Sequence, residues 1–221
     1  MVEQKILILL AGNAGAGKDS LGRCLKRTLT GSSSTRLDSF AFTLKSFAHQ
    51  SMGTPWSSLN GDKDMKEKET LQCAGEDTGI TIRSGLQKIG EWFRQIFSPK
   101  IWANGLWIRV LDSEEQITIV TDCRYPREEI DWLREVAKDH ARLVCVRVRN
   151  SRVPVIHGHP SEDVIANEPD STFDFIVENE GSLSDLQLQA DSIVEDLGLV
   201  EGDCTTIALD LIADSQGKES L

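Results

Sequence analysis

A glycine-rich segment near the start of this 221-residue chain constrains its fold and function most strongly. Residues 12–18 read Gly-Asn-Ala-Gly-Ala-Gly-Lys, between an expected strand, Lys5–Ala11, and an expected helix, Lys18–Thr28. This is the G-x-x-x-x-G-K pattern of a phosphate-binding loop in its required context. The glycines let successive N–H groups point at phosphate oxygens, and the helix start adds the positive end of its dipole. The residues predicted to contact a nucleotide are Gly12, Asn13, Ala14, Gly15, Ala16, Gly17, Lys18, Asp19 and Ser20.

The rest of the chain alternates short apolar runs with helical stripes, a rhythm that predicts an α/β fold with a parallel sheet. A helix is expected to begin near Pro126, and another to span Ser182–Leu197. The length suits a single domain, which we expect over residues 1–199. The remaining strands are expected at Thr35–Ala41, Gln116–Asp122, Arg142–Arg149 and Phe173–Glu178.

Two long segments interrupt this rhythm. Residues 43–107 are too many for a simple crossover, and they are expected to form a mostly helical insert in which the polar stretch Asn60–Glu69 is a loop. Residues 148–171 are rich in proline and are expected to form a lid-like loop over the edge of the sheet. Long loops inside compact domains are usually functional or disordered. Residues 200–221 form an acidic tail, in which Ile207–Ile212 could be an edge element.

Composition excludes several classes of protein. The net charge of −11 argues against a partner that is a nucleic-acid polymer, because such binders normally present a basic face. The longest clean apolar run, Ile6–Ala11, is far shorter than the roughly 20 residues of a membrane span, and no secretory signal is visible. The five cysteines form no CxxC pair, which favours a reducing compartment and hence the cytoplasm. His157 and His159 make only a weak zinc pattern.

Acidic residues near the loop are candidate magnesium ligands. Asp122 ends an apolar strand, where an acid in a phosphate-loop protein orients Mg²⁺; its alternative role is a cap at the strand end. The residue after the loop lysine is usually Ser or Thr, but here Asp19 precedes Ser20, and the sequence leaves open which of them contacts the metal. Arg124 is expected at the carboxyl ends of the strands, as a clamp on the transferred phosphate.

A second group of residues is typical of a site for a phosphorylated acceptor. Arg83, Gln87 and Arg94 share one face of a predicted helix. Guanidinium groups grip phosphate by paired hydrogen bonds, and an amide can read the edge of a base; a solvated polar face is the alternative. Lys45 and Trp102 are further candidates for this acceptor site.

The lid-like segment supplies the last candidates. Arg147 and Arg149 are two residues apart in a predicted strand and so share one face. A mobile arginine loop can close over phosphates and exclude water. We predict a catalytic role for Arg149, and His159 and Glu162 are expected to anchor the loop.

In their order along the chain, these blocks resemble the deoxynucleoside monophosphate kinases of tailed bacteriophages, relatives of the wider nucleoside monophosphate kinase group. The family's phosphate loop also has aspartate after the lysine, as Gly12–Ser20 has here. Phe42 and Thr43 depart from the family, whose members often carry Asp-Pro or Gly-Pro there. The other matching blocks are Phe40-Ala41-x-x-Leu44-Lys45, Arg83-x-x-x-Gln87-x-x-Gly90 with Trp102, Thr121-Asp122-x-Arg124-Tyr125-Pro126, Arg149 with His159-Pro160-Ser161-Glu162, and Phe173–Leu183.

The resemblance implies a three-layer α/β/α phosphate-loop fold with a five-stranded parallel sheet. It implies transfer of the γ-phosphoryl group of ATP, with Mg²⁺, to the 5′-phosphate of a deoxynucleoside monophosphate (dNMP). Lys18 would hold the donor phosphates, and Asp122 would position Mg²⁺ with Asp19 or Ser20. Relatives are often dimers, so the resemblance leaves a homodimer open, although nothing in the sequence shows a dimer surface, and a viral source would place the protein in the host cytosol. The arginines implied to bind or bridge phosphates are Arg83, Arg94, Arg124 and Arg149.

Two other functions fit the same sequence. One is a phosphate-loop kinase of another small metabolite, of which dephospho-coenzyme A kinase and phosphomevalonate kinase are examples; the departure at Phe42 and Thr43 leaves room for it. The other is an ATP-dependent switch without a small-molecule acceptor. The arginine-rich acceptor region argues against a switch, since a switch needs no second phosphate site.

Overall fold

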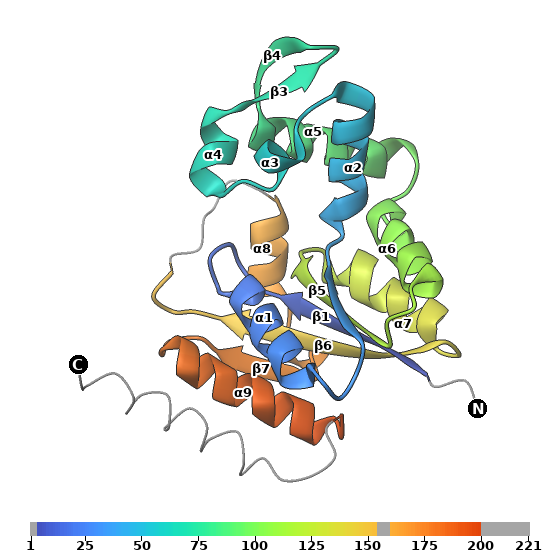
Figure 1. The fold of residues 1–221 in the computed structure, drawn as a ribbon, viewed down its shortest axis with the longest axis vertical. Helices are drawn as coiled ribbons and strands as arrows, with labels where there is room; N and C mark the ends of the chain where they lie inside the picture. Colours follow the sequence, from blue (N-terminus) through green and yellow to red (C-terminus); the bar gives the residue numbers. More distant parts are fainter. Residues whose placement is uncertain (1–3, 154–159, 200–221) are drawn as a thin grey trace, which may run out of the picture.

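The computed structural model describes residues 4–153 and 160–199, and its centre is a parallel sheet of five strands in the order β2-β5-β1-β6-β7 (Figure 1). β1 lies in the middle and is buried from Ile6 onward, as its apolar sequence predicts. Ala11 at its end pairs with Cys123 of β5 and Arg147 of β6, so the carboxyl ends of these strands meet at one edge. The strands are β1 (Lys5–Ala11), β2 (Thr35–Asp38), β5 (Ile117–Cys123), β6 (Ala141–Arg149) and β7 (Phe175–Glu178).

Helices cover both faces of the sheet, which confirms the predicted three-layer fold. α1 (Lys18–Leu29) and α9 (Leu183–Asp196) pack on one face, where Leu21 and Ile193 join the core formed with Ile8. α6 (Ile101–Asp112) and α7 (Trp132–Ala137) pack on the other, where Leu106 and Leu133 meet the opposite side of β1. Among the described residues, no helix is long and apolar enough to cross a membrane.

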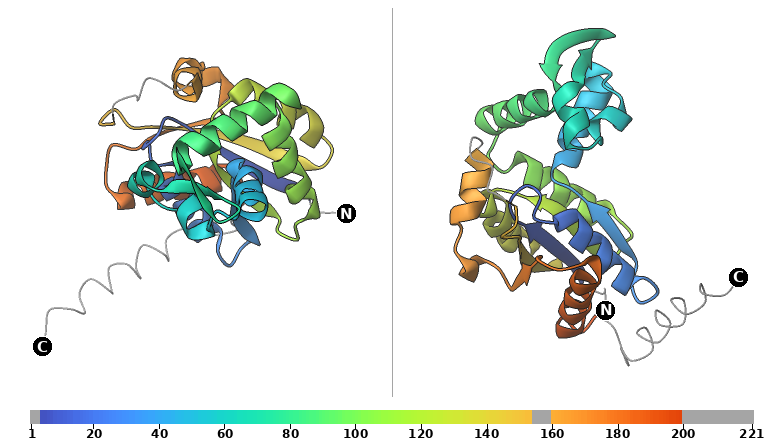
Figure 2. Two further views of the ribbon diagram at one scale, coloured as in Figure 1. Left: turned by 90° about the horizontal axis from the view of Figure 1, so that it is seen from above. Right: turned by 90° about the vertical axis from the view of Figure 1, so that its left-hand side faces the viewer.

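The insert between β2 and β5 is helical, as predicted, but it also contains a hairpin that the sequence analysis missed. The two antiparallel strands lie at the end of the molecule farthest from α9, as Figure 1 and the right-hand view of Figure 2 show. A separate small core, which includes Ala48, Leu59 and Leu71, holds the insert together. Its elements are α2 (Ala41–Met52), α3 (Trp56–Leu59), α4 (Lys63–Lys68), β3 (Thr70–Cys73), β4 (Glu76–Thr81) and α5 (Ile82–Ile96), followed by α6.

Two predicted boundaries in this region are wrong. The stretch Asn60–Glu69, predicted as a loop, contains α4, whose first turn is capped because the Asp62 carboxylate accepts the Met65 N–H at 2.8 Å. The strand predicted over Thr35–Ala41 ends at Asp38, since Ala41 already begins α2.

The C-terminal half has more helix than predicted. The segment 148–171 contains α8 (Pro160–Asn167) and the first two residues of the 3₁₀ turn η2 (Asp170–Thr172). The chain after Pro126 begins with a π-helical turn, η1 (Arg127–Asp131), before α7. The strand predicted from Phe173 begins at Phe175, and Ile207–Ile212 lies outside the described residues.

Candidate active site

The phosphate-binding loop depends on three glycines with positive φ angles. Gly12, Gly15 and Gly17 have φ of 153°, 82° and 102°. A Cβ added to Gly12 would lie 2.3 Å from the carbonyl oxygen of Val148, and one on Gly17 would lie 2.1 Å from Nδ2 of Asn179. The backbone conformation favours glycine at all three positions, and at Gly12 the backbone of β6 leaves no room for a side chain either.

Lys18 and Asn179 hold the loop by hydrogen bonds to its backbone carbonyl oxygens. The Nζ of Lys18, which is only 9% exposed, donates to the carbonyl oxygens of Gly12 at 2.7 Å and Asn13 at 2.9 Å. The Nδ2 of Asn179 donates to the carbonyl oxygen of Ala16 at 2.9 Å. Asn179 was not predicted as a site residue, although its place just after the last strand puts it at the same edge of the sheet.

The three candidate metal ligands have different surroundings. The exposed carboxylate of Asp19 accepts the Thr121 hydroxyl at 2.6 Å, whereas Ser20 is half-buried in the first turn of α1. Asp122 accepts the backbone N–H groups of Phe40 at 2.8 Å and Ala41 at 3.0 Å, so it holds the start of α2. Burial raises the pKa of Asp122, while those two N–H groups, Arg124 and Lys45 oppose the rise. No group of three acidic, histidine or cysteine side chains suited to a metal occurs in the described part of the chain.

Three cationic side chains from separate parts of the chain, Lys45, Arg83 and Arg124, act electrostatically on Lys66, and Lys45 lines a cavity together with Asp19. Burial lowers the pKa of Lys66, and the neighbouring charges of Lys45, Arg83 and Arg124 lower it further, while Asp19 opposes them. Burial also lowers the pKa of Lys45, against Asp122 and Asp19, and its Nζ donates to Oδ1 of Asn60 at 3.0 Å. We call Lys45, Lys66, Arg83 and Arg124 the cation cluster.

Lys66 is a member that the sequence analysis missed, because it lies in a stretch predicted to be a loop. It is half-buried, while Met65, Glu67 and Lys68 beside it on α4 are exposed. Among these four residues, the helical turn therefore directs only Lys66 inward. Gln87, one turn after Arg83 on α5, is half-buried as well.

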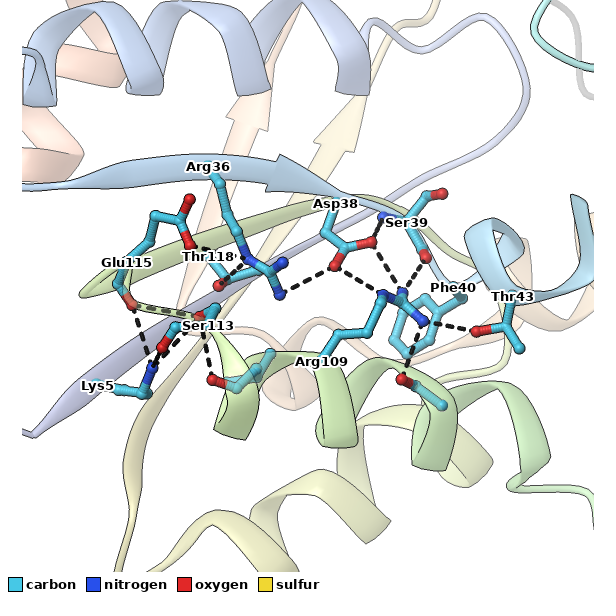
Figure 3. Close-up of polar contacts among 12 residues, drawn as sticks. Lys5, Arg36, Asp38, Ser39, Phe40, Thr43, Arg109, Ser113, Glu115 and Thr118 are labelled. Carbon is cyan, nitrogen blue, oxygen red and sulfur yellow. Dashed lines mark hydrogen bonds and ion pairs between the residues drawn. The ribbon is translucent and has the colours of Figure 1, made fainter. Parts of the chain in front are cut away.

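A cavity of about 400 Å³ opens beside Asp19 at the end of β2; we call it the β2 cavity. Arg109 forms one wall and is held in place by a bidentate pair with Asp38, at 2.8 and 3.1 Å, and by the Thr43 hydroxyl at 2.6 Å (Figure 3). Arg36 pairs with the same Asp38 at 3.0 Å. The lining residues are Asp19, Arg23, Arg36, Leu37, Asp38, Ser39, Phe42, Lys45, Arg109 and Thr121.

A second cavity, of about 420 Å³, lies on the other side of the phosphate-binding loop; we call it the β6 cavity. Arg149 lines it and pairs with Asp170 and with Glu178, the latter at 3.6 Å. Arg147 also borders it but is only 6% exposed, with Nη2 donating to the carbonyl oxygen of Ile165 at 2.9 Å. Arg147 therefore holds α8, and the prediction that it forms part of a mobile lid is wrong. The lining residues are Asn13, Ala14, Ala16, Arg147, Val148, Arg149, Asn150, Ser151, Val153, Ala166 and Glu178.

Two predicted acceptor residues have structural partners instead. Trp102 is 4% exposed and lies in the core, where its indole N–H donates to the carbonyl oxygen of Gly90 at 3.2 Å. Arg94 faces Glu129 at 3.4 Å and stacks on the ring of Tyr125. Neither residue lines the two cavities.

The two remaining candidates belong to the lid-like segment. Glu162 is part of α8. His159 lies outside the described residues, as does its neighbour His157.

Searches of protein-family models and of curated proteins find no match for the chain. Among solved structures, the chain resembles the APS kinase of Mycobacterium tuberculosis, with 13% identity over 88% of this chain and 98% of that one, and a TM-score of 0.46. It also resembles the shikimate kinase of Aquifex aeolicus, with 13% identity over 87% and 99%, and a TM-score of 0.43. A fungal RNA kinase has 11% identity over 98% of this chain and 99% of that one, and its TM-score is 0.39. The residues of the site itself therefore carry the functional argument.

Proposed function

We propose that this chain is a phosphate-loop kinase that transfers the γ-phosphoryl group of ATP to the 5′-phosphate of a dNMP. One observation carries the proposal: Lys45 lines the β2 cavity together with Asp19 beside the phosphate-binding loop, and Lys66 lies within electrostatic reach of Asp19 and of the other three members of the cation cluster. The loop suits the phosphates of a donor, and a separate group of lysines and arginines suits those of an acceptor. Phosphoryl transfer needs positioning and charge neutralisation more than covalent chemistry, and these residues provide both.

The residues around the loop fit ATP and Mg²⁺. The curled glycine backbone and Lys18 suit the β- and γ-phosphates, and the β6 cavity with Arg149 offers room for the rest of the nucleotide. Mg²⁺ prefers oxygen ligands, which Asp19 and Asp122 provide. We favour Asp19 over Ser20, because Asp19 lines the β2 cavity. When bound, the metal neutralises charge on the transferred phosphate.

The acceptor is proposed from the cation cluster and from the resemblance together. Lys45, Lys66 and Arg83 belong to three different helices of the insert, so they can surround a phosphate from several sides. Gln87 on α5 is proposed to read the base. The resemblance alone supports a deoxynucleotide over another phosphorylated metabolite. A simple ATP switch would leave the cation cluster without a role.

An ADP-release assay tests the proposal directly. Mg-ATP is offered with each of the four common dNMPs, their ribose counterparts and dephospho-coenzyme A. Turnover with one or more dNMPs is the expected result, and it gives base and sugar preference at once. Turnover with only a non-nucleotide acceptor would contradict the dNMP proposal and keep the kinase. ATP binding without turnover of any acceptor would favour the switch.

Lys66 gives a sharper test of the acceptor site. Lys66→Met should raise the KM for the monophosphate roughly tenfold to a hundredfold, since a hydrogen bond to a charged group contributes about 1.5–3 kcal/mol. The KM for ATP should change little. Lys68→Met is the matched control, because Lys68 lies on the same helix with a side chain 77% exposed. Similar effects of the two substitutions would remove Lys66 from the site.

A further inference from the structure

Glu129 is a buried carboxylate to which the proposed function gives no role. It lies in the π-helical turn η1 and is only 2% exposed. Burial raises its pKa to about 7, while the N–H groups of Tyr125 and Arg124 and the charge of Arg94 oppose that rise. A buried carboxylate is costly unless it is hydrogen-bonded, so its partners show what it holds in place.

One carboxylate oxygen fixes the backbone that carries Arg124. Oε2 accepts the backbone N–H of Arg124 at 2.8 Å and that of Tyr125 at 3.0 Å. In addition, the N–H of Glu129 donates to the carbonyl oxygen of Tyr125 at 2.8 Å. Glu129 therefore holds the short segment between β5 and η1 in a turn through its side chain and its own backbone N–H.

The other carboxylate oxygen reaches a different part of the molecule. Oε1 lies 3.4 Å from Nη2 of Arg94, and the Arg94 guanidinium lies 4.2 Å from the centre of the Tyr125 ring. Arg94 belongs to α5, the same helix that carries Arg83 and Gln87. Arg94 of the insert is thus held by an ion pair with Glu129 and by a cation–π contact with Tyr125.

We propose that Glu129 is a positioning residue for phosphoryl transfer, which links the Arg124 segment to α5 through Arg94. The inference rests on the proposed function, since Arg83 and Arg124 matter to it as phosphate-binding residues. With this link intact, Arg124, the proposed clamp on the phosphate, keeps a fixed position relative to α5, which carries Arg83 and Gln87. Positioning of this kind counts in catalysis, because small displacements of catalytic groups cost large factors in rate.

Glu129→Gln separates the two halves of the link. The glutamine carbonyl oxygen can still accept both backbone N–H groups, but its amide nitrogen then faces Arg94 and cannot accept a bond from it. We expect the acceptor KM to rise roughly tenfold, because Arg83 and Gln87 on α5 lose their fixed position relative to Arg124, with the KM for ATP unchanged within about twofold. Glu128→Gln is the matched control, since it removes the same charge from the same turn. Equal changes in both KM values, or no difference from the control, would overturn the proposal.

Arg94→Gln tests the link from the other side. It should give the same selective rise in acceptor KM, and the double variant with Glu129→Gln should be no worse than either single variant, because residues that act as a unit are not additive. Additive effects would overturn the link between the two side chains.

Hydrogen exchange of the Arg124 and Tyr125 amides in Glu129→Ala gives a readout that does not depend on activity. Both amides should exchange faster than in the wild-type protein and in Glu128→Gln, and unchanged rates would contradict the role of Oε2. If Glu129→Ala does not fold, the glutamine variants still decide the proposal. If wild-type protein phosphorylates no monophosphate, the proposed function fails while exchange still tests the contacts.

Discussion

Replacing Lys18 with methionine should lower kcat by roughly a hundredfold to a thousandfold, the usual cost of removing one charged or hydrogen-bonding group aimed at a transition state. The ammonium group is the one cation that the phosphate-binding loop itself carries. Methionine keeps most of the unbranched stem, so the largely buried position stays filled. The measurement is ADP release at saturating Mg-ATP and acceptor, together with thermal unfolding of the variant.

The control is Lys26→Met on the same helix. Lys26 is exposed in the last turn of α1, remote from the loop, and its removal should leave kcat unchanged. Normal turnover in Lys18→Met would show that the loop does not hold the donor phosphates. A large fall in melting temperature would show instead that the bonds from Lys18 to Gly12 and Asn13 serve mainly the fold.

The sheet and the phosphate-binding loop were predictable because their signals are local. Strands covered on both faces are almost continuously apolar, and Ile6–Ala11 is buried throughout. The G-x-x-x-x-G-K spacing fixes where the first helix begins, and α1 begins at Lys18. These features need no knowledge of distant contacts, and the fold prediction is confirmed by the structure.

Contacts between distant parts of the chain account for what was missed. Asp122 ends β2 early and starts α2, because its carboxylate binds the N–H groups of Phe40 and Ala41, far away in sequence. The hairpin of β3 and β4 lacks an alternating apolar pattern, since β4 is mostly exposed. Its formation depends on Leu71, which packs in the small core of the insert.

The side-chain roles were harder to predict than the elements. Arg94 does share a helix with Arg83 and Gln87, but its partners, Glu129 and Tyr125, come from another part of the chain. Spacing cannot distinguish an arginine that binds phosphate from one that binds a buried carboxylate. The assignments of Arg83, Gln87, Arg124 and Arg149 to phosphate and base therefore stay predictions for the experiments above.

Gly12→Ala should abolish nucleotide binding, because the new methyl group has no room and no suitable backbone conformation. Its Cβ would lie 2.3 Å from the carbonyl oxygen of Val148, which belongs to β6 and is paired with Val177 of β7. The Val148 carbonyl cannot move aside easily, because it belongs to the backbone of a paired strand inside the sheet. We expect a loss of about 3 kcal/mol in the free energy of unfolding, from overpacking and from the strain of a positive φ together. Calorimetric titration with Mg-ATP and chemical unfolding measure the two effects.

Gly31→Ala separates steric clash from conformational strain. Gly31 also has a positive φ, of 93°, but a Cβ there meets nothing within 4 Å. It should cost only about 1 kcal/mol in unfolding free energy and leave ATP affinity unchanged, because only the strain of a positive φ acts there and the clash is missing. If Gly12→Ala lost no more stability than Gly31→Ala and still bound ATP, the loop would have freedom to move away from Val148. The loop would then take its shape only when the ligand binds. If Gly12→Ala alone loses stability and ATP binding, the phosphate site is already formed against β6 in the absence of nucleotide.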